Sequence, residues 1–184
     1  MDAVMRARPF ATASALIWAL TGCIGNSPEQ QAADALGPDF GQYETGPYHR
    51  AGFPCVTCHG GLWWQPTPAF ELAGTVYQRS SGGAASRNAA IDIKDASGHA
   101  FTARTNSAGN FFVVVAGNQP QQYGDGRSEI PWQLDFPLSV RVRASGADQP
   151  MRSRVWKERS CAACHNGTPT AESNGRIFIE EPAQ

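Results

Sequence analysis

The amino-acid sequence predicts a mainly β protein, an antiparallel β-sandwich flanked by loop-rich segments with short helices. Apolar and charged residues alternate with a period of two at 91–94 and at 140–143, which is typical of strands with one solvated face. Residues 111–115 are continuously apolar and predict a central strand that is buried on both faces. We expect strands at 70–77, 89–95, 100–106, 110–116 and 138–144, and a short final strand at 177–179.

The segments around these strands are rich in turn-forming residues. Residues 24–41 contain mostly glycine, proline, alanine, glutamine and aspartate, and predict a tether with one short helix near 28–36. Residues 42–68 are rich in glycine, proline and aromatic residues, so we expect little regular structure there. Three prolines and two glycines between positions 118 and 137 predict a loop.

The N-terminus has the pattern of an export signal. Arg6 and Arg8 precede an apolar run at 10–20 that is too short to span a bilayer. Residues 20–23 (Leu-Thr-Gly-Cys) resemble the lipobox of bacterial lipoproteins. That resemblance implies cleavage before Cys23, acylation of Cys23 and a lipid anchor, and the residue that follows weakly favours the outer membrane, facing the periplasm or the cell surface. The alternative is an ordinary signal peptide that leaves Cys23 as a spare thiol.

A Cys-x-x-Cys-His pattern occurs twice, at Cys55, Cys58 and His59 and at Cys161, Cys164 and His165. On one helical turn, positions i, i+3 and i+4 share a face, so the two cysteines and the histidine of each pattern can point to the same side. The pattern resembles the haem-attachment motif of c-type cytochromes. That resemblance implies two covalently bound haem c groups, thioether bonds from the four cysteines, and the two histidines as proximal iron ligands.

These motifs complete the expected division of the chain. The segments are a signal at 1–22, a tether at 23–41, a first haem-binding segment at 42–69, the β-sandwich at 70–158 and a second haem-binding segment at 159–184. Since the ends of a compact domain often lie close together, we expect the two motifs to be spatial neighbours.

The second axial ligand of each haem is less certain from the sequence. His49, His99 and Met151 are the ordinary candidates outside the signal segment. His49 lies six residues before the first motif in a glycine- and proline-containing loop, and it is the favoured ligand of the first haem. His99 and Met151 remain equal alternatives for the second haem, and each could instead be an ordinary surface or core residue.

Zinc binding and local disulfides are alternative uses of the cysteines. Two Cys-x-x-Cys pairs can form a zinc site, but the gap between them is far longer than usual and zinc does not explain the histidines. Local redox disulfides lack the expected βαβ context. Trp63 and Trp64 could pack on a haem or at the entry to the sandwich. Basic residues that could form a solvated face, pair with haem propionates or steer an acidic partner are Arg141, Arg143, Arg152, Arg154, Lys157 and Arg159.

The middle of the chain has a second resemblance. Residues 74–76, 88–93, 95–98 and 105–111 resemble a carboxypeptidase-regulatory-like, transthyretin-type sandwich. The resemblance covers about 70–117 and implies a structural module without catalytic residues, which would hold the two haem segments.

Together these patterns predict a membrane-anchored dihaem cytochrome that transfers electrons to redox protein partners of the cell envelope. The formal net charge of −1 gives no indication of nucleic-acid binding. One alternative is a haem enzyme with one open axial position, similar to a peroxidase. The other is a surface binding or adhesion module with structural Cys-x-x-Cys sites.

Overall fold

The computed structural model describes residues 26–38, 45–61, 68–117, 125–167 and 169–179. The signal segment, Cys23, Trp63 and Trp64 lie outside the described residues. The chain divides into two units, at 1–36 and 37–184.

The first unit contains the helix α1, Pro28–Ala35, which confirms the short helix expected near 28–36. Proline can occupy a first helical position because its missing N–H has no partner there anyway. The Ser27 hydroxyl accepts a hydrogen bond from the Gln30 N–H at 3.2 Å and caps the helix. Within the described ranges no helix is long and apolar enough to cross a membrane.

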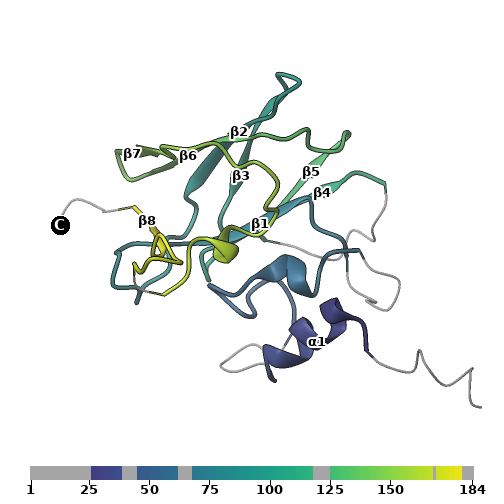
Figure 1. Cartoon of the computed structure of the whole chain (residues 1–184). Coiled ribbons are helices and arrows are strands. Elements are labelled where there is room, and N and C mark those ends of the chain that lie inside the picture. Colours follow the sequence, from purple (N-terminus) through teal and green to yellow (C-terminus); the bar gives the residue numbers. More distant parts are fainter. Residues whose placement is uncertain (1–25, 39–44, 62–67, 118–124, 168, 180–184) are drawn as a thin grey trace, which may run out of the picture. The chain divides into compact units, whose positions relative to one another are not determined.

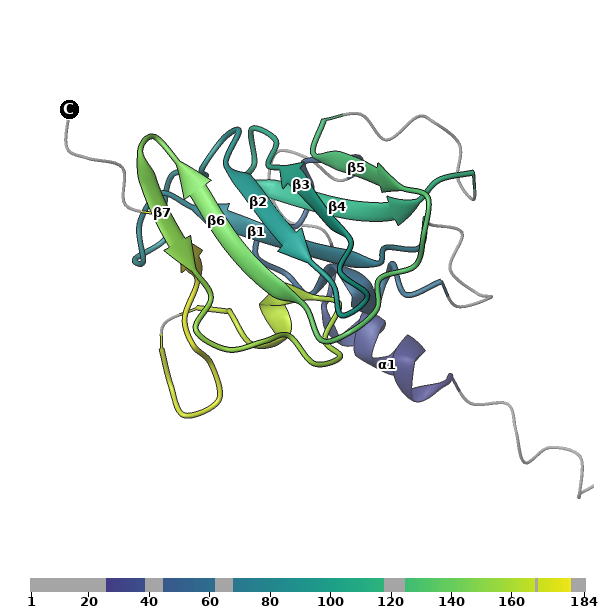
Figure 2. The ribbon, with the colours of Figure 1, turned by 90° about the horizontal axis from the view of Figure 1, so that it is seen from above.

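The second unit is a β-sandwich, as the sequence predicts, and Figures 1 and 2 show its two layers. In the described chain each sheet has four strands. The first sheet has the order β5-β4-β1-β8, with β5 at Arg127–Ile130, β4 at Asn110–Val115, β1 at Leu72–Tyr77 and β8 at Ile177–Phe178. The second has the order β3-β2-β6-β7, with β3 at Ala100–Arg104, β2 at Ala90–Lys94, β6 at Ser139–Ala144 and β7 at Ala147–Pro150.

Strand pairing is fully antiparallel in the second sheet and mixed in the first. β1 pairs antiparallel with β4, whereas β4 pairs with β5, and β1 with β8, in parallel. The antiparallel sandwich predicted from the sequence is confirmed, and the two outer pairs of the first sheet are parallel exceptions within it.

Two strands were not expected. β5 lies inside the segment 118–137, for which the sequence predicts a loop, and it forms because the buried strand β4 offers it a parallel partner. β7 pairs with β6 through a two-residue turn, in which Ser145 and Gly146 have φ values of 46° and 85°. β7 contains no β-branched residue and is mostly exposed, so its sequence carries little strand signal.

The main core lies between the two sheets. Leu72 and Phe111 of the first sheet pack there with Ile91, Ile93 and Val142 of the second. A separate apolar cluster covers the opposite face of the first sheet and contains Phe70, Ala73, Phe112 and Val114, with Cys55 and Val56 packed against them. β1 and β4 are therefore buried on both faces, which confirms the prediction for 111–115.

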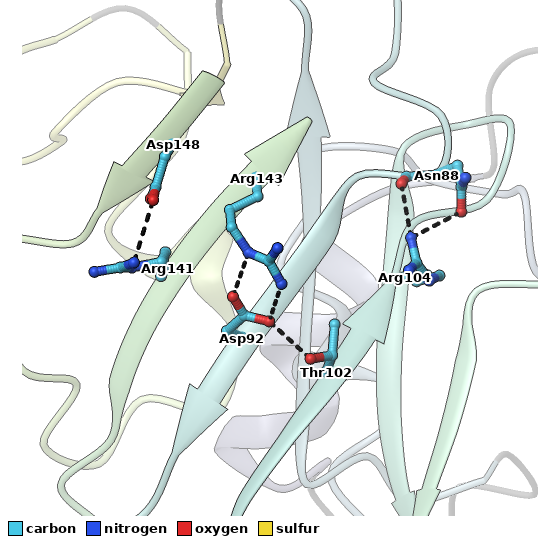
Figure 3. Close-up of polar contacts among 7 residues, drawn as sticks. All are labelled: Asn88, Asp92, Thr102, Arg104, Arg141, Arg143 and Asp148. Atoms are coloured by element: carbon cyan, nitrogen blue, oxygen red, sulfur yellow. Dashed lines mark hydrogen bonds and ion pairs between the residues drawn. The ribbon is translucent and has the colours of Figure 1, made fainter. Parts of the chain in front are cut away.

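The outer face of the second sheet is polar (Figure 3). The guanidinium of Arg143 donates two hydrogen bonds to Asp92, at 2.6 and 2.8 Å, and holds the pKa of that carboxyl below its usual range. Arg141 pairs with Asp148 at 3.2 Å. These exposed pairs contribute little to stability, and they show that both arginines belong to a solvated sheet face.

Candidate functional site

Both Cys-x-x-Cys-His motifs fold into the same short turn. Each begins a 3₁₀ turn, at Cys55–Thr57 and at Cys161–Ala163. The Cys55 carbonyl accepts hydrogen bonds from the N–H groups of Cys58 and His59, at 3.2 and 2.9 Å. The Cys161 carbonyl accepts the equivalent pair from Cys164 and His165, at 3.2 and 2.8 Å. Residues i and i+3 lie on one side of such a turn, so each pair of cysteines is placed to attach to one edge of a flat group.

The two motif histidines are oriented in the same way. Nδ1 of His59 lies 3.0 Å from the Pro68 carbonyl, and Nδ1 of His165 lies 3.0 Å from the Gly175 carbonyl. A carbonyl can only accept, so each Nδ1 carries the proton and each Nε2 keeps a free lone pair. Metal-binding histidines in proteins are commonly held by such a contact.

The surroundings of His59 favour its neutral form. Its side chain is buried and stacks on Phe70, with ring centroids 4.1 Å apart and planes within 10°. Burial lowers the pKa of His59, and the neighbouring His49 lowers it further, against the opposing effect of the Pro68 carbonyl. Only neutral imidazole can coordinate a metal, so this environment favours the form that binds.

Cys55 and Cys161 lie in surroundings that favour neutral sulfur. Burial raises the pKa of Cys55 to about 11 and that of Cys161 to about 12, and the proximity of Cys55 adds to the shift at Cys161. The Cys161 side chain lies over Gly74, where an added Cβ would be 2.8 Å from both its Cβ and its Sγ. A thioether is neutral and fits this environment, whereas zinc binds thiolates.

Neither rival use of the cysteines is assembled in the described residues. The four motif cysteines form no disulfide there. Within the same part of the chain, no three or more histidine, cysteine or acidic side chains come together as a metal site.

The thiol environments predict slow alkylation in chain made without haem. Raising a thiol pKa from 9.0 to about 11 lowers its thiolate fraction at pH 8 roughly a hundredfold. The greater nucleophilicity of the more basic thiolate offsets part of this, which leaves Cys55 about tenfold slower with iodoacetamide than an exposed thiol. Cys161 should be slower still. Peptide mass spectrometry measures both, with exposed Cys164 as the internal control. Equal rates for all thiols in the folded chain would contradict the burial.

The structure brings the two motifs together around β1, which confirms that they are neighbours. Ser160 pairs with Ala73 of β1, and the Ala73 N–H donates to the Arg159 carbonyl at 2.9 Å. The Arg159 guanidinium donates to the Phe70 carbonyl at 3.2 Å and to the Gly60 carbonyl, directly after the first motif, at 3.3 Å. Arg159 therefore ties the start of the second motif to the end of the first.

His49 lies beside the first motif. The Asn110 side-chain amide donates to the His49 carbonyl at 3.0 Å and so anchors its loop to β4. The Nδ1 of His49 contacts the Gly46 carbonyl, as Nδ1 does in the two motif histidines. Its ring centroid is 5.9 Å from that of His59.

A cavity of about 650 Å³ lies beside the second motif, within the range of sites for small molecules and cofactors. It occupies the edge of the sandwich near β7 and β8, and Cys161, Cys164, His165 and Met151 line it. Ser160 also lines it, and its hydroxyl is buried without a hydrogen-bond partner in the described chain. An unpaired buried hydroxyl and an apolar lining beside this motif fit a bound prosthetic group.

Charged residues and a tryptophan also line the cavity. The basic ones are Arg152, Arg154, Lys157 and Arg176, Glu158 is acidic, and the Trp156 side chain is 72% exposed. His99, by contrast, is not among the described residues that line it. His99 lies at the β2–β3 turn, where Nδ1 contacts Asp95 at 3.0 Å and the ring stacks on Trp132.

Sequence reasoning did not identify the supporting roles of four residues. Phe70 stacks on His59, Gly74 makes room for Cys161, Arg159 joins the motifs and Trp156 lines the cavity. The basic pattern includes Arg159, but no local signal distinguishes it from its neighbours. Comparison with known proteins gives no match to a family model, a curated protein or a solved structure.

Proposed function

We propose that this protein is a dihaem c-type cytochrome that transfers electrons. The observation that carries the proposal is the repeated turn: two Cys-x-x-Cys-His segments have the same backbone hydrogen bonds, and each holds its histidine by Nδ1 with Nε2 available. A Cys₄ zinc site or a redox disulfide gives no reason for a histidine to follow both cysteine pairs.

Haem would supply one-electron iron chemistry when bound, and the chain's own residues would hold and shield it. Cys55 and Cys58, like Cys161 and Cys164, would form the thioether bonds, with His59 and His165 as proximal ligands. Phe70 fixes the plane of the His59 ring through stacking. The apolar clusters against which the two turns pack would keep water from one side of each group.

The N-terminal pattern supports a place for this activity in the cell envelope. Acylation of Cys23 would anchor the chain to the outer membrane, and the described unit would exchange electrons with protein partners there. A peroxidase-like haem enzyme remains the second proposal, because the cavity beside His165 could admit a small molecule.

The test is haem content in material made with a c-type maturation system. We expect two haems per chain by pyridine haemochrome spectroscopy, both retained in the mass spectrum of the denatured chain. An exported chain with no added porphyrin mass would exclude the proposal and favour a binding or adhesion module. A ferric spectrum that is low-spin throughout would exclude the peroxidase-like activity, whereas a high-spin component would support it.

A further inference from the structure

We infer that the two haem sites have different axial ligands, His49 at the first site and Met151 at the second. The second site would therefore have the higher reduction potential and would be reduced first. This inference depends on the proposed function. It concerns the side chain that completes each site and the relative reduction potentials of the two haems.

The geometry at the first site suits two histidines. Two imidazoles on opposite sides of one metal ion have ring centroids roughly 6 Å apart, given metal–nitrogen bonds of about 2 Å. The centroids of His49 and His59 are 5.9 Å apart. Each ring contacts a backbone carbonyl through Nδ1, which leaves Nε2 as its ligand atom. The Asn110 amide anchors the loop that carries His49 to the sheet.

The second site has a methionine where the first has a histidine. Met151 and His165 line the same cavity, together with both cysteines of the second motif. The Met151 N–H donates to the Val140 carbonyl at 2.9 Å, so its backbone is fixed along β6 beside the cavity. A thioether sulfur is an established axial ligand of haem iron.

His99 is placed for a different role. Its imidazole is bonded to the buried carboxylate of Asp95 and stacked on Trp132, with centroids 4.7 Å apart. The backbone N–H of His99 also donates a hydrogen bond to the Asp95 carboxylate at 2.8 Å, which closes the β2–β3 turn. These contacts hold His99 in the β2–β3 hairpin. His99 is not among the described residues that line the cavity beside His165.

Unlike ligands give the two sites unlike reduction potentials. Methionine opposite histidine raises the potential of haem iron relative to two histidines. Positive charge acts in the same direction because it stabilises the added electron, and Arg152, Arg154 and Lys157 all line the second cavity. One electron would pass from the first site to the second without any change in covalent bonds. One protein partner of the envelope would donate that electron to the first site, and another would accept it from the second.

The experiment compares Met151→Leu, Met151→His, His49→Ala and His99→Ala in fully loaded protein. For the wild type we expect one methionine–iron charge-transfer band in the ferric spectrum and two separate midpoint potentials in a redox titration. Met151→Leu should abolish the band and leave the low potential unchanged. Met151→His should abolish the band but keep that site low-spin, and should move the upper midpoint down toward the lower.

The control variants separate the alternatives. His99→Ala should change neither the band nor either midpoint, whereas His49→Ala should keep the band and convert the other site to high spin. Loss of a low-spin signal in His99→Ala, or a Met151→Leu spectrum identical to the wild type, would overturn the inference while leaving the dihaem proposal intact. Wild-type protein without covalent haem would instead overturn the proposed function.

Discussion

Replacing Cys161 and Cys164 together with alanine is expected to leave a chain that carries one covalent haem in place of two. The physical reason is that each turn is built from its own backbone hydrogen bonds and holds its histidine through a separate carbonyl. The first motif packs on the outer face of the first sheet through Cys55 and Val56. The measurement is intact mass under denaturing conditions, with haem staining of the same band.

The matched variant replaces Cys55 and Cys58 with alanine, and it should also retain one haem. Removing all four cysteines should leave none. The spectrum of each single-site protein should correspond to one half of the wild-type spectrum. If either double variant kept both haems, or if each lost both, independent attachment at the two motifs would be wrong.

The second large effect is expected for Gly74→Ala. A Cβ at Gly74 would lie 2.8 Å from both Cβ and Sγ of Cys161 and 2.9 Å from the Phe111 ring. Cβ of Cys161 is fixed by its backbone, so the strand or the second motif must move. Overpacking of this kind costs roughly 1–3 kcal/mol of unfolding free energy. We expect a lower denaturation midpoint and reduced haem attachment at the second motif.

Gly98→Ala provides the matched control. Gly98 has a φ of +90° and open space around it, so alanine strains the backbone there without touching either motif. Both variants should lose stability, but only Gly74→Ala should lose haem at the second motif while keeping it at the first. Full loading and wild-type stability of Gly74→Ala would show that Cys161 does not pack over this glycine.

Local patterns in the sequence were sufficient for most of the sandwich. The alternation at 91–94 and 140–143 predicted β2 and β6, and the apolar run at 111–115 predicted the buried strand β4. β5 and β7 were missed because they are short, polar and stabilised by an existing neighbour. A strand of that kind depends on its partner more than on its own residues.

The candidate site divides in a similar way. Both motifs stand out in the sequence because the cysteines and the histidine of each lie within five consecutive residues. His49 stands out because it lies six residues before the first motif. The sequence left Met151 and His99 as equal alternatives for the second site, because Met151 could be an ordinary core residue and His99 an ordinary surface residue on a turn. In the structure Met151 lines the same cavity as His165, whereas His99 is hydrogen-bonded within its hairpin.

The sequence by itself determined the mainly β fold, the two Cys-x-x-Cys-His turns and the residues that could bind iron. Only the tertiary structure decided that both turns meet around β1, joined by Arg159, and that a cavity lies beside the second. The reason is that spacing and periodicity act over a few residues, whereas the pairing of Ala73 with Ser160 joins positions that are distant in the chain. Such contacts depend on how whole strands pack, which no short stretch of sequence encodes.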